Sequence, residues 1–194
     1  NLPEKVGGVG LDAVSVMLIE KELGRTSLAL AECAHRPLNI LAACEDEQVT
    51  QFLEPTLRGE KRDCIAMTEP GAGSDLRGMK CKAVRDGGCW IINGEKHFIS
   101  QAFVSDFCVL FAATGEEKTN KGIKKLISAF LVDFSDPGVE VAPGYKNVSH
   151  RGYTNNILRF ENARIPEWRI MGSVGDGFRL VNQWLGPTRL TVAA

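Results

Sequence analysis

The chain has 194 residues, of which 44% are apolar and 24% charged, and its formal net charge is -1. This length suits one good hydrophobic core or slightly more, and the composition is typical of a soluble globular protein. The near-neutral charge gives no electrostatic basis for binding nucleic acid, and no apolar run is long enough to cross a membrane. We therefore expect neither a nucleic-acid partner nor membrane insertion, and no signal-peptide pattern opens the chain.

Cysteines and histidines are scattered along the chain. The six cysteines form no C-x-x-C pair, and no histidine stands at metal-ligand spacing from them. This pattern predicts free thiols in a reducing compartment and no metal site. The residues concerned are Cys33, Cys44, Cys64, Cys81, Cys89, Cys108, His35, His97 and His150.

The first 60 residues have the apolar spacing of helices. Asp12 suits a helix start and Gly24 a helix end, and Asp46 to Leu57 is expected to form a second, short helix. We expect the apolar positions of the stretch to pack in the protein core. They are Val14, Met17, Leu18, Leu28, Leu30 and Ala31.

From about Cys64 the apolar pattern alternates with a period of two, which predicts strands. Turns are expected at Asp86-Gly87-Gly88 and at Asn93-Gly94, since Asn-Gly is a strong hairpin signal. The expected strands cover 64–67, 79–84, 89–92, 95–100, 107–114, 126–133, 139–142 and 156–160. The pattern predicts an α+β fold, in which a helical segment is followed by a small antiparallel β-barrel or sandwich domain.

After Pro166 the pattern is helical again. Apolar residues follow Gly175-Asp176-Gly177, and we expect Pro187 to kink or restart this helix because proline lacks a backbone donor.

The loop Thr68-Glu69-Pro70-Gly71-Ala72-Gly73-Ser74-Asp75 follows the first predicted strand. Gly71 and Gly73 permit positive φ, and the small neighbours would allow backbone N–H groups to converge on an anion such as a diphosphate. The loop is neither a G-x-G-x-x-G dinucleotide fingerprint nor a Walker A loop, because it lacks the third glycine and a Gly-Lys-Ser or Gly-Lys-Thr. On composition alone, an ordinary turn remains the alternative.

Three segments together resemble the acyl-CoA dehydrogenase family: Thr68 to Asp75, Ile92 to Ser100 and Phe160 to Pro166. The resemblance covers nearly the whole chain. It implies that residues 1–62 are the end of an N-terminal helical domain and residues 63–172 a middle β domain. Residues 173–194 would be the truncated start of a C-terminal helical domain.

The resemblance implies an FAD-dependent oxidoreductase that converts an acyl-CoA thioester to a trans-2-enoyl-CoA. Thr68 would bind the pyrimidine edge of the flavin, Met67 would line the ring, and Gly73 and Ser74 would hold the diphosphate region. Phe98 would stand in place of a family tryptophan on one flavin face, and Ser100 in place of a threonine near N5. Ser74 and Arg189 are candidates for substrate binding, although a structural or interface role suits Arg189 as well.

No catalytic base is identified in the 194 residues. In some branches of the family the base stands at the position of Thr188, and a threonine hydroxyl does not ionise in the required range. We therefore expect these residues alone to be inactive and to hold FAD poorly.

The implied partners are an acyl-CoA substrate, an electron-transfer flavoprotein or other acceptor, and further copies of the subunit in a dimer or tetramer. The implied location is the mitochondrial matrix, a peroxisome or the cytoplasm. The segment Gly115 to Lys125 is either a solvated loop or a basic rim, formed by Lys118, Lys121, Lys124 and Lys125, for the phosphates of coenzyme A. Alternatives to the dehydrogenase are an acyl-CoA oxidase, a non-catalytic module that retains the β domain, and a generic β-barrel carrier.

Overall fold

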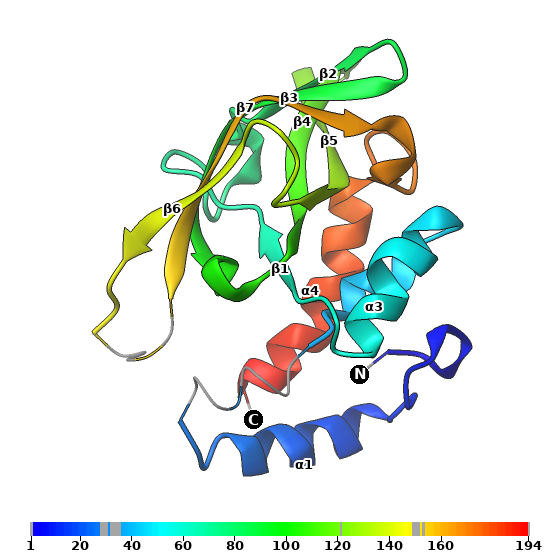
Figure 1. Cartoon of the computed structure of the whole chain (residues 1–194), viewed down its shortest axis with the longest axis vertical. Coiled ribbons are helices and arrows are strands. Elements are labelled where there is room, and N and C mark those ends of the chain that lie inside the picture. The colour runs from blue at the N-terminus through cyan, green and yellow to red at the C-terminus, as the bar shows by residue number, and fades with distance from the viewer. Residues whose placement is uncertain are drawn as a thin grey trace.

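The computed structural model describes residues 2–27, 31, 36–120, 122–148, 152 and 154–193 (Figure 1). The α-helices are α1 (Ala13–Leu23), α3 (Glu54–Leu57) and α4 (Gly177–Ala193), and η3 (Val49–Leu53) is a π-helix that leads into α3. Short 3₁₀ turns are η1 (Glu4–Val6), η2 (Asn39–Ala43), η4 (Leu76–Gly78), η5 (Ala102–Val104) and η6 (Glu167–Arg169). The strands are β1 (Asp63–Ala66), β2 (Lys82–Asp86), β3 (Cys89–Ser100), β4 (Phe107–Thr119), β5 (Gly122–Asp133), β6 (Val139–Tyr145), β7 (Asn155–Pro166) and β8 (Ile170–Met171).

The strands form one curled sheet in the order β6-β7-β3-β2-β4-β5-β8, with β1 paired to β4. The predicted α+β class is confirmed. The sheet is mixed and not purely antiparallel, because β1 and β2 both pair with β4 in parallel. Figure 1 shows the curled strands on one side of the molecule and α1, α3 and α4 on the other.

Two hydrophobic cores hold this arrangement together. The first lies within the curl of the sheet and includes Trp90, Phe130 and Leu158. The second lies between the sheet and the helical segments, where Phe52 and Phe107 meet edge to face with ring centroids 4.9 Å apart. Burial of such side chains on both sides fixes the sheet relative to α3 and α4.

Helix α1 begins and ends where the sequence predicted. The Asp12 carboxylate accepts hydrogen bonds from the backbone N–H groups of Val14 and Ser15, and Gly24 follows the last turn. The expectation that its apolar residues are buried is wrong: Val14 is 66% and Leu18 60% exposed. The physical reason is that, among the described residues, α1 packs mainly on α4 and nothing covers this stripe. Leu28 and Leu30 lie outside the described residues.

The expected turn at Asn93-Gly94 is also wrong, because β3 runs through it without a break. An added Cβ on Gly94 would lie 2.6 Å from the Cα of Cys81, so glycine is needed for close backbone approach. The Asn93 side chain accepts a hydrogen bond from the N–H of Asn162, where β7 carries one extra residue opposite β3. The dipeptide therefore marks a β-bulge.

Residues 115–119 and 122–125 belong to β4 and β5 at the end of their hairpin, so the expected loop is wrong. Glu116 lies opposite Lys125 and Glu117 opposite Lys124, and such opposite-charge pairs favour continued strand pairing. Lys125 also donates to the carbonyl of Met79 at 2.7 Å. Lys121 lies outside the described residues.

Helix α4 continues through Gly186-Pro187, so Pro187 does not restart the helix. The hydroxyl of Thr188 donates to the carbonyl oxygen of Trp184 at 2.9 Å, which keeps this turn closed on itself. No described helix is both long and apolar enough to cross a membrane.

Candidate functional site

The residues that follow β1 lie directly against β3. Thr68 comes two positions after the strand ends at Ala66, and its carbonyl oxygen accepts a hydrogen bond from the N–H of His97 at 2.8 Å. Thr68 is therefore joined by one backbone bond to the residue that precedes Phe98. The structure thus brings together Thr68 and Phe98, two of the predicted site residues.

Phe98 projects from a bulge in β3. Between Lys96 and Ile99 this strand has one more residue than β7 opposite it, and Phe98 takes a left-handed backbone conformation with φ 57°. A left-handed conformation is uncommon for a bulky residue, and bulges near functional sites often redirect a side chain. Here the bulge leaves Phe98 50% exposed while Ile99 is buried.

One face of the Phe98 ring is covered by Tyr145 of β6. The two rings stack with centroids 4.1 Å apart and 14° between their planes. The Tyr145 hydroxyl lies 2.5 Å from Nδ1 of His97, whose Nε2 contacts the Glu95 carboxylate. The contact with His97, followed by that with Arg159, holds the pKa of Glu95 below its ordinary value.

Glu69 anchors the loop that follows Thr68. Its carboxylate accepts hydrogen bonds from the N–H groups of Lys80 and Cys81 at 2.6 and 3.0 Å and from the Lys96 ammonium at 2.8 Å. Burial opposes the charged form of this carboxylate, but Lys96 and the backbone donors outweigh burial and lower the pKa of Glu69. The loop is therefore held by a buried anion with several donors.

The tip of the loop presents unused backbone donors. Among the described residues, the N–H groups of Thr68, Gly71, Gly73 and Ser74 donate no hydrogen bond. A Cβ built on Gly71 or Gly73 would meet no atom within 4 Å, so the backbone there is open to an approaching group. Such clustered donors suit an anion.

The predicted use of positive φ in this loop is wrong. Neither Gly71 nor Gly73 has a positive φ. Reciprocal backbone hydrogen bonds between Glu69 and Ala72, at 2.9 and 3.1 Å, close the turn around Gly71. The two glycines matter here for the space around them and not for their backbone angles.

The remaining predicted residues are placed as follows. Met67 is half-buried and packs against the core between sheet and helices. Ser100 is half-buried at the end of β3, paired with Asn155 of β7. Arg189 is exposed in the last part of α4. The placement of both the Thr68 and Ser100 hydroxyls against a single ring remains a prediction.

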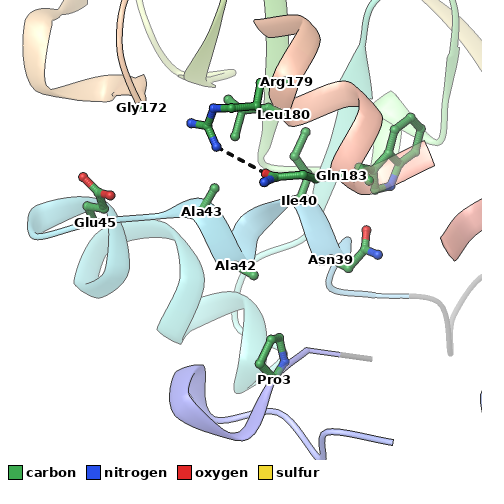
Figure 2. Close-up of a pocket in the computed structure, with 11 residues that line it drawn as sticks. Pro3, Asn39, Ile40, Ala42, Ala43, Glu45, Gly172, Arg179, Leu180 and Gln183 are labelled. Carbon is green, nitrogen blue, oxygen red and sulfur yellow. Dashed lines mark hydrogen bonds between the residues drawn. The ribbon is translucent and has the colours of Figure 1, made fainter. Parts of the chain in front are cut away.

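A separate cavity of about 410 Å³ lies between η2 and α4 (Figure 2). Figure 2 shows Arg179 and Gln183 of α4 facing Ile40 and Ala43 of η2. None of the predicted site residues lines this cavity. The candidate site is instead the open surface at the end of β1 and β3.

The middle-domain model of the acyl-CoA dehydrogenase family matches residues 64–163. The chain belongs to the acyl-CoA dehydrogenase family. The matched segment runs from β1 to β7 and therefore contains the Thr68 loop and Phe98.

Individual members of the acyl-CoA dehydrogenase family match the whole chain. Cyclohex-1-ene-1-carbonyl-CoA dehydrogenase of Geobacter metallireducens is 37% identical over all of this chain and 51% of its own length. The human mitochondrial short-chain specific acyl-CoA dehydrogenase is 33% identical over all of this chain and 47% of its own length. The chain thus spans about half the length of these relatives.

The fold of this acyl-CoA dehydrogenase family member is likewise similar to that of solved relatives. The crystal structure of an acyl-CoA dehydrogenase complexed with FAD from Bacillus anthracis superposes with a TM-score of 0.83 at 28% identity. The match covers 97% of this chain and 33% of that one.

Sequence reasoning missed three residues that shape this family member's candidate site: Glu69, Lys96 and Tyr145. Glu69 and Lys96 stand within the motif segments, and Lys96 is a charged residue in a strand that the structure buries completely. The sequence carried no signal for this pair, because Glu69 follows the end of β1 and a charged residue in a strand usually faces solvent. No sequence signal indicates the Phe98–Tyr145 stack, because it depends on how β6 and β7 pair and on the bulge at Phe98.

Proposed function

We propose that these residues form the flavin-binding part of an FAD-dependent acyl-CoA dehydrogenase, which oxidises an acyl-CoA thioester to a trans-2-enoyl-CoA. The observation that carries the proposal is the set of unused N–H donors from Thr68 to Ser74 beside the half-exposed ring of Phe98. Family membership and a relative that was solved with FAD support the choice of cofactor.

The chemistry of these residues fits FAD. Backbone N–H groups at Gly73 and Ser74 suit the diphosphate, and the open space at Gly73 allows close approach. The Thr68 N–H and hydroxyl would hold the pyrimidine edge of the ring, with Met67 alongside. Phe98 offers an apolar face, and Ser100 a hydroxyl for N5. When bound, FAD accepts the hydride that leaves the β-carbon of the thioester.

The chain's own residues would bind and orient the reactants. We propose that Ser74 and Arg189 contact the acyl-CoA. We assign no base for the α-proton, because the Thr188 hydroxyl donates to Trp184 and does not ionise in the required range. Residues 1–194 alone are therefore expected to turn over no acyl-CoA.

The rest of the proposal follows from the family. We propose the division into residues 1–62, 63–172 and 173–194, an electron-transfer flavoprotein or other acceptor as partner, and assembly as a dimer or tetramer. Five described cysteines are free thiols, which suits a reducing compartment such as the mitochondrial matrix, a peroxisome or the cytoplasm.

The test uses the protein at its native length. Its visible absorption spectrum should show bound flavin, and anaerobic addition of butyryl-CoA or longer acyl-CoA should bleach it. Bleaching in air with consumption of oxygen would indicate an acyl-CoA oxidase. A native protein that carries no flavin and takes up none on incubation with FAD would exclude the proposal and favour a non-catalytic module.

A further inference from the structure

Lys96 is completely buried, and its ammonium has two bonding partners. Its side chain is 0% exposed, and Nζ lies 2.8 Å from Oε1 of Glu69 and 3.1 Å from the carbonyl oxygen of Met67. Burying a lysine is costly unless it is paired, and Glu69 supplies the countercharge. The hydrogen bond to the Met67 carbonyl is not required for that neutralisation, but it places the Lys96 ammonium against the peptide group that leads into Thr68.

The carbonyl of Met67 and the N–H of Thr68 belong to one peptide group. Among the described residues, the Thr68 N–H donates no hydrogen bond, whereas the carbonyl on the other side of the same group meets an ammonium. A cation at the carbonyl oxygen draws electron density from the nitrogen and makes the N–H a stronger donor. Hydrogen bonds in series reinforce one another in this way, most of all where water is excluded.

We propose that Lys96, through the Met67–Thr68 peptide, strengthens the Thr68 N–H as a donor to FAD and so raises the reduction potential of the bound flavin. This inference rests on the proposed function. Reduced flavin carries negative charge near N1 and O2, so a stronger donor at that edge stabilises the reduced form more than the oxidised form. Lys96 is thus a positioning residue that acts through the backbone and never touches the ring.

The chain contains a matched comparison. Lys125 also donates to a methionine carbonyl, that of Met79, at 2.7 Å. The N–H of that peptide belongs to Lys80 and is already bonded to Glu69. Lys125→Met therefore removes the same kind of contact from a peptide whose N–H is occupied.

The main variant is the double substitution Lys96→Met with Glu69→Gln. Lys96→Met alone would leave an unpaired carboxylate, whose charge would itself lower the potential. The double variant keeps the net charge of the pair at zero, so neither residue is left as a buried charge without its partner. It therefore separates the effect on the peptide from the effect of charge.

Two measurements on the native-length protein test the inference. The first is the midpoint potential of bound FAD, with dissociation constants for oxidised and reduced FAD. We expect the double variant to weaken binding of reduced FAD roughly tenfold more than that of oxidised FAD, which for a two-electron couple equals about 30 mV toward negative potential. Lys125→Met should leave both values unchanged.

The second measurement is the amide proton and nitrogen NMR shift of Thr68 in flavin-free protein. We expect the double variant to move the Thr68 amide proton upfield and Lys125→Met to leave it in place. A wild-type potential in the double variant, an equal shift in Lys125→Met, or an unmoved Thr68 amide would each overturn the inference while leaving the proposed function intact. Failure of the wild-type protein to bind FAD would overturn both.

Discussion

The rings of Phe98 and Tyr145 stack 4.1 Å apart, although the two residues lie on strands that do not pair with each other. The bulge at Phe98 turns its ring outward. Strand β7 pairs with both β3 and β6 and so sets the distance between the two strands that carry the rings. The aromatic side chain at the candidate flavin face is therefore held in place by a second ring and not by the core.

The stack leads to a prediction for a double-mutant cycle. Phe98→Ala, Tyr145→Ala and the double variant should give a coupling energy of about 0.5–1.5 kcal/mol, because aromatic pairs contribute this much beyond buried area. The measurement is urea unfolding of each variant. Tyr145→Phe is the control, since it keeps the stack and removes only the contact of the hydroxyl with His97. Additive effects of the two alanine substitutions would show that the stack contributes nothing to stability.

Substitution by alanine should lower the unfolding free energy at Gly94 but not at Gly73. Gly94→Ala places a Cβ 2.6 Å from the Cα of Cys81, so the segment before β2 must move away from β3, and overpacking of this kind costs about 1–3 kcal/mol. Gly73→Ala meets no atom within 4 Å and should leave the unfolding free energy within about 0.5 kcal/mol of wild type. If the loop holds the FAD diphosphate, Gly73→Ala should nevertheless weaken FAD binding in the native-length protein. Urea unfolding and flavin titration on both variants give the comparison. Normal FAD affinity in Gly73→Ala would show that this loop does not hold the diphosphate.

Asp63 makes stability depend on pH. It is 0% exposed at the start of β1, and burial raises its pKa against the opposing influence of Arg36 and the hydrogen bond from the N–H of Leu38. A raised pKa in the folded state means that the favourable contribution is fully present below the unfolded pKa of about 3.9 and is lost as pH rises through the folded value.

Asp63→Asn should abolish this loss of stability with rising pH. The unfolding free energy of the variant relative to wild type should therefore increase as pH rises above about 4, and then stay level once the wild-type carboxyl is ionised. Urea titrations from acid to neutral pH measure this difference. Asp106→Asn is the control, because Asp106 also accepts a backbone N–H, that of Arg62, but on an exposed residue. A difference that does not change with pH would mean that Asp63 ionises alike in both states.

Local sequence patterns predicted those features of the fold that depend on neighbouring residues. Asp12 caps α1, Gly87 and Gly88 turn β2 into β3, and the apolar runs of β4 and β5 form strands. The sequence predictions failed where contacts between distant segments determine the structure. Gly94 is required by the backbone of Cys81, and the apolar stripe of α1 is exposed because no other described element packs over it.

The candidate site shows the same division. The Thr68 loop and Phe98 could be found from motifs, because the residue types and their order are specific. The roles of Glu69 and Lys96 could not, because a charged residue in a strand usually faces solvent, and only the three-dimensional contact shows that these two bury each other. The motif residues could thus be found from the sequence, but the network that fixes their backbone could not.

That network predicts a large effect for Glu69→Gln on its own. The substitution leaves the Lys96 ammonium buried without its countercharge, and breaking a buried pair in this way costs about 3–5 kcal/mol. The double variant with Lys96→Met should recover most of this loss, and the difference between the single and double variants, measured by urea unfolding, gives the cost of leaving Lys96 buried without its countercharge. Equal stability of the single and double variants would mean that water or another group neutralises Lys96.

The same carboxylate predicts a loss of stability in acid. Because Lys96 and the backbone donors lower the pKa of Glu69 despite its burial, its contribution is present above the unfolded pKa of about 4.3 and is lost as pH falls through the folded value. In the double variant this part of the acid sensitivity should be absent, so the stability difference between wild type and double variant should shrink as pH drops below about 4. Asp63 acts in the opposite direction over the pH range just above, so the comparison is best made in an Asp63→Asn background. A stability difference that stays constant into acid would show that Glu69 ionises alike in the native and unfolded states.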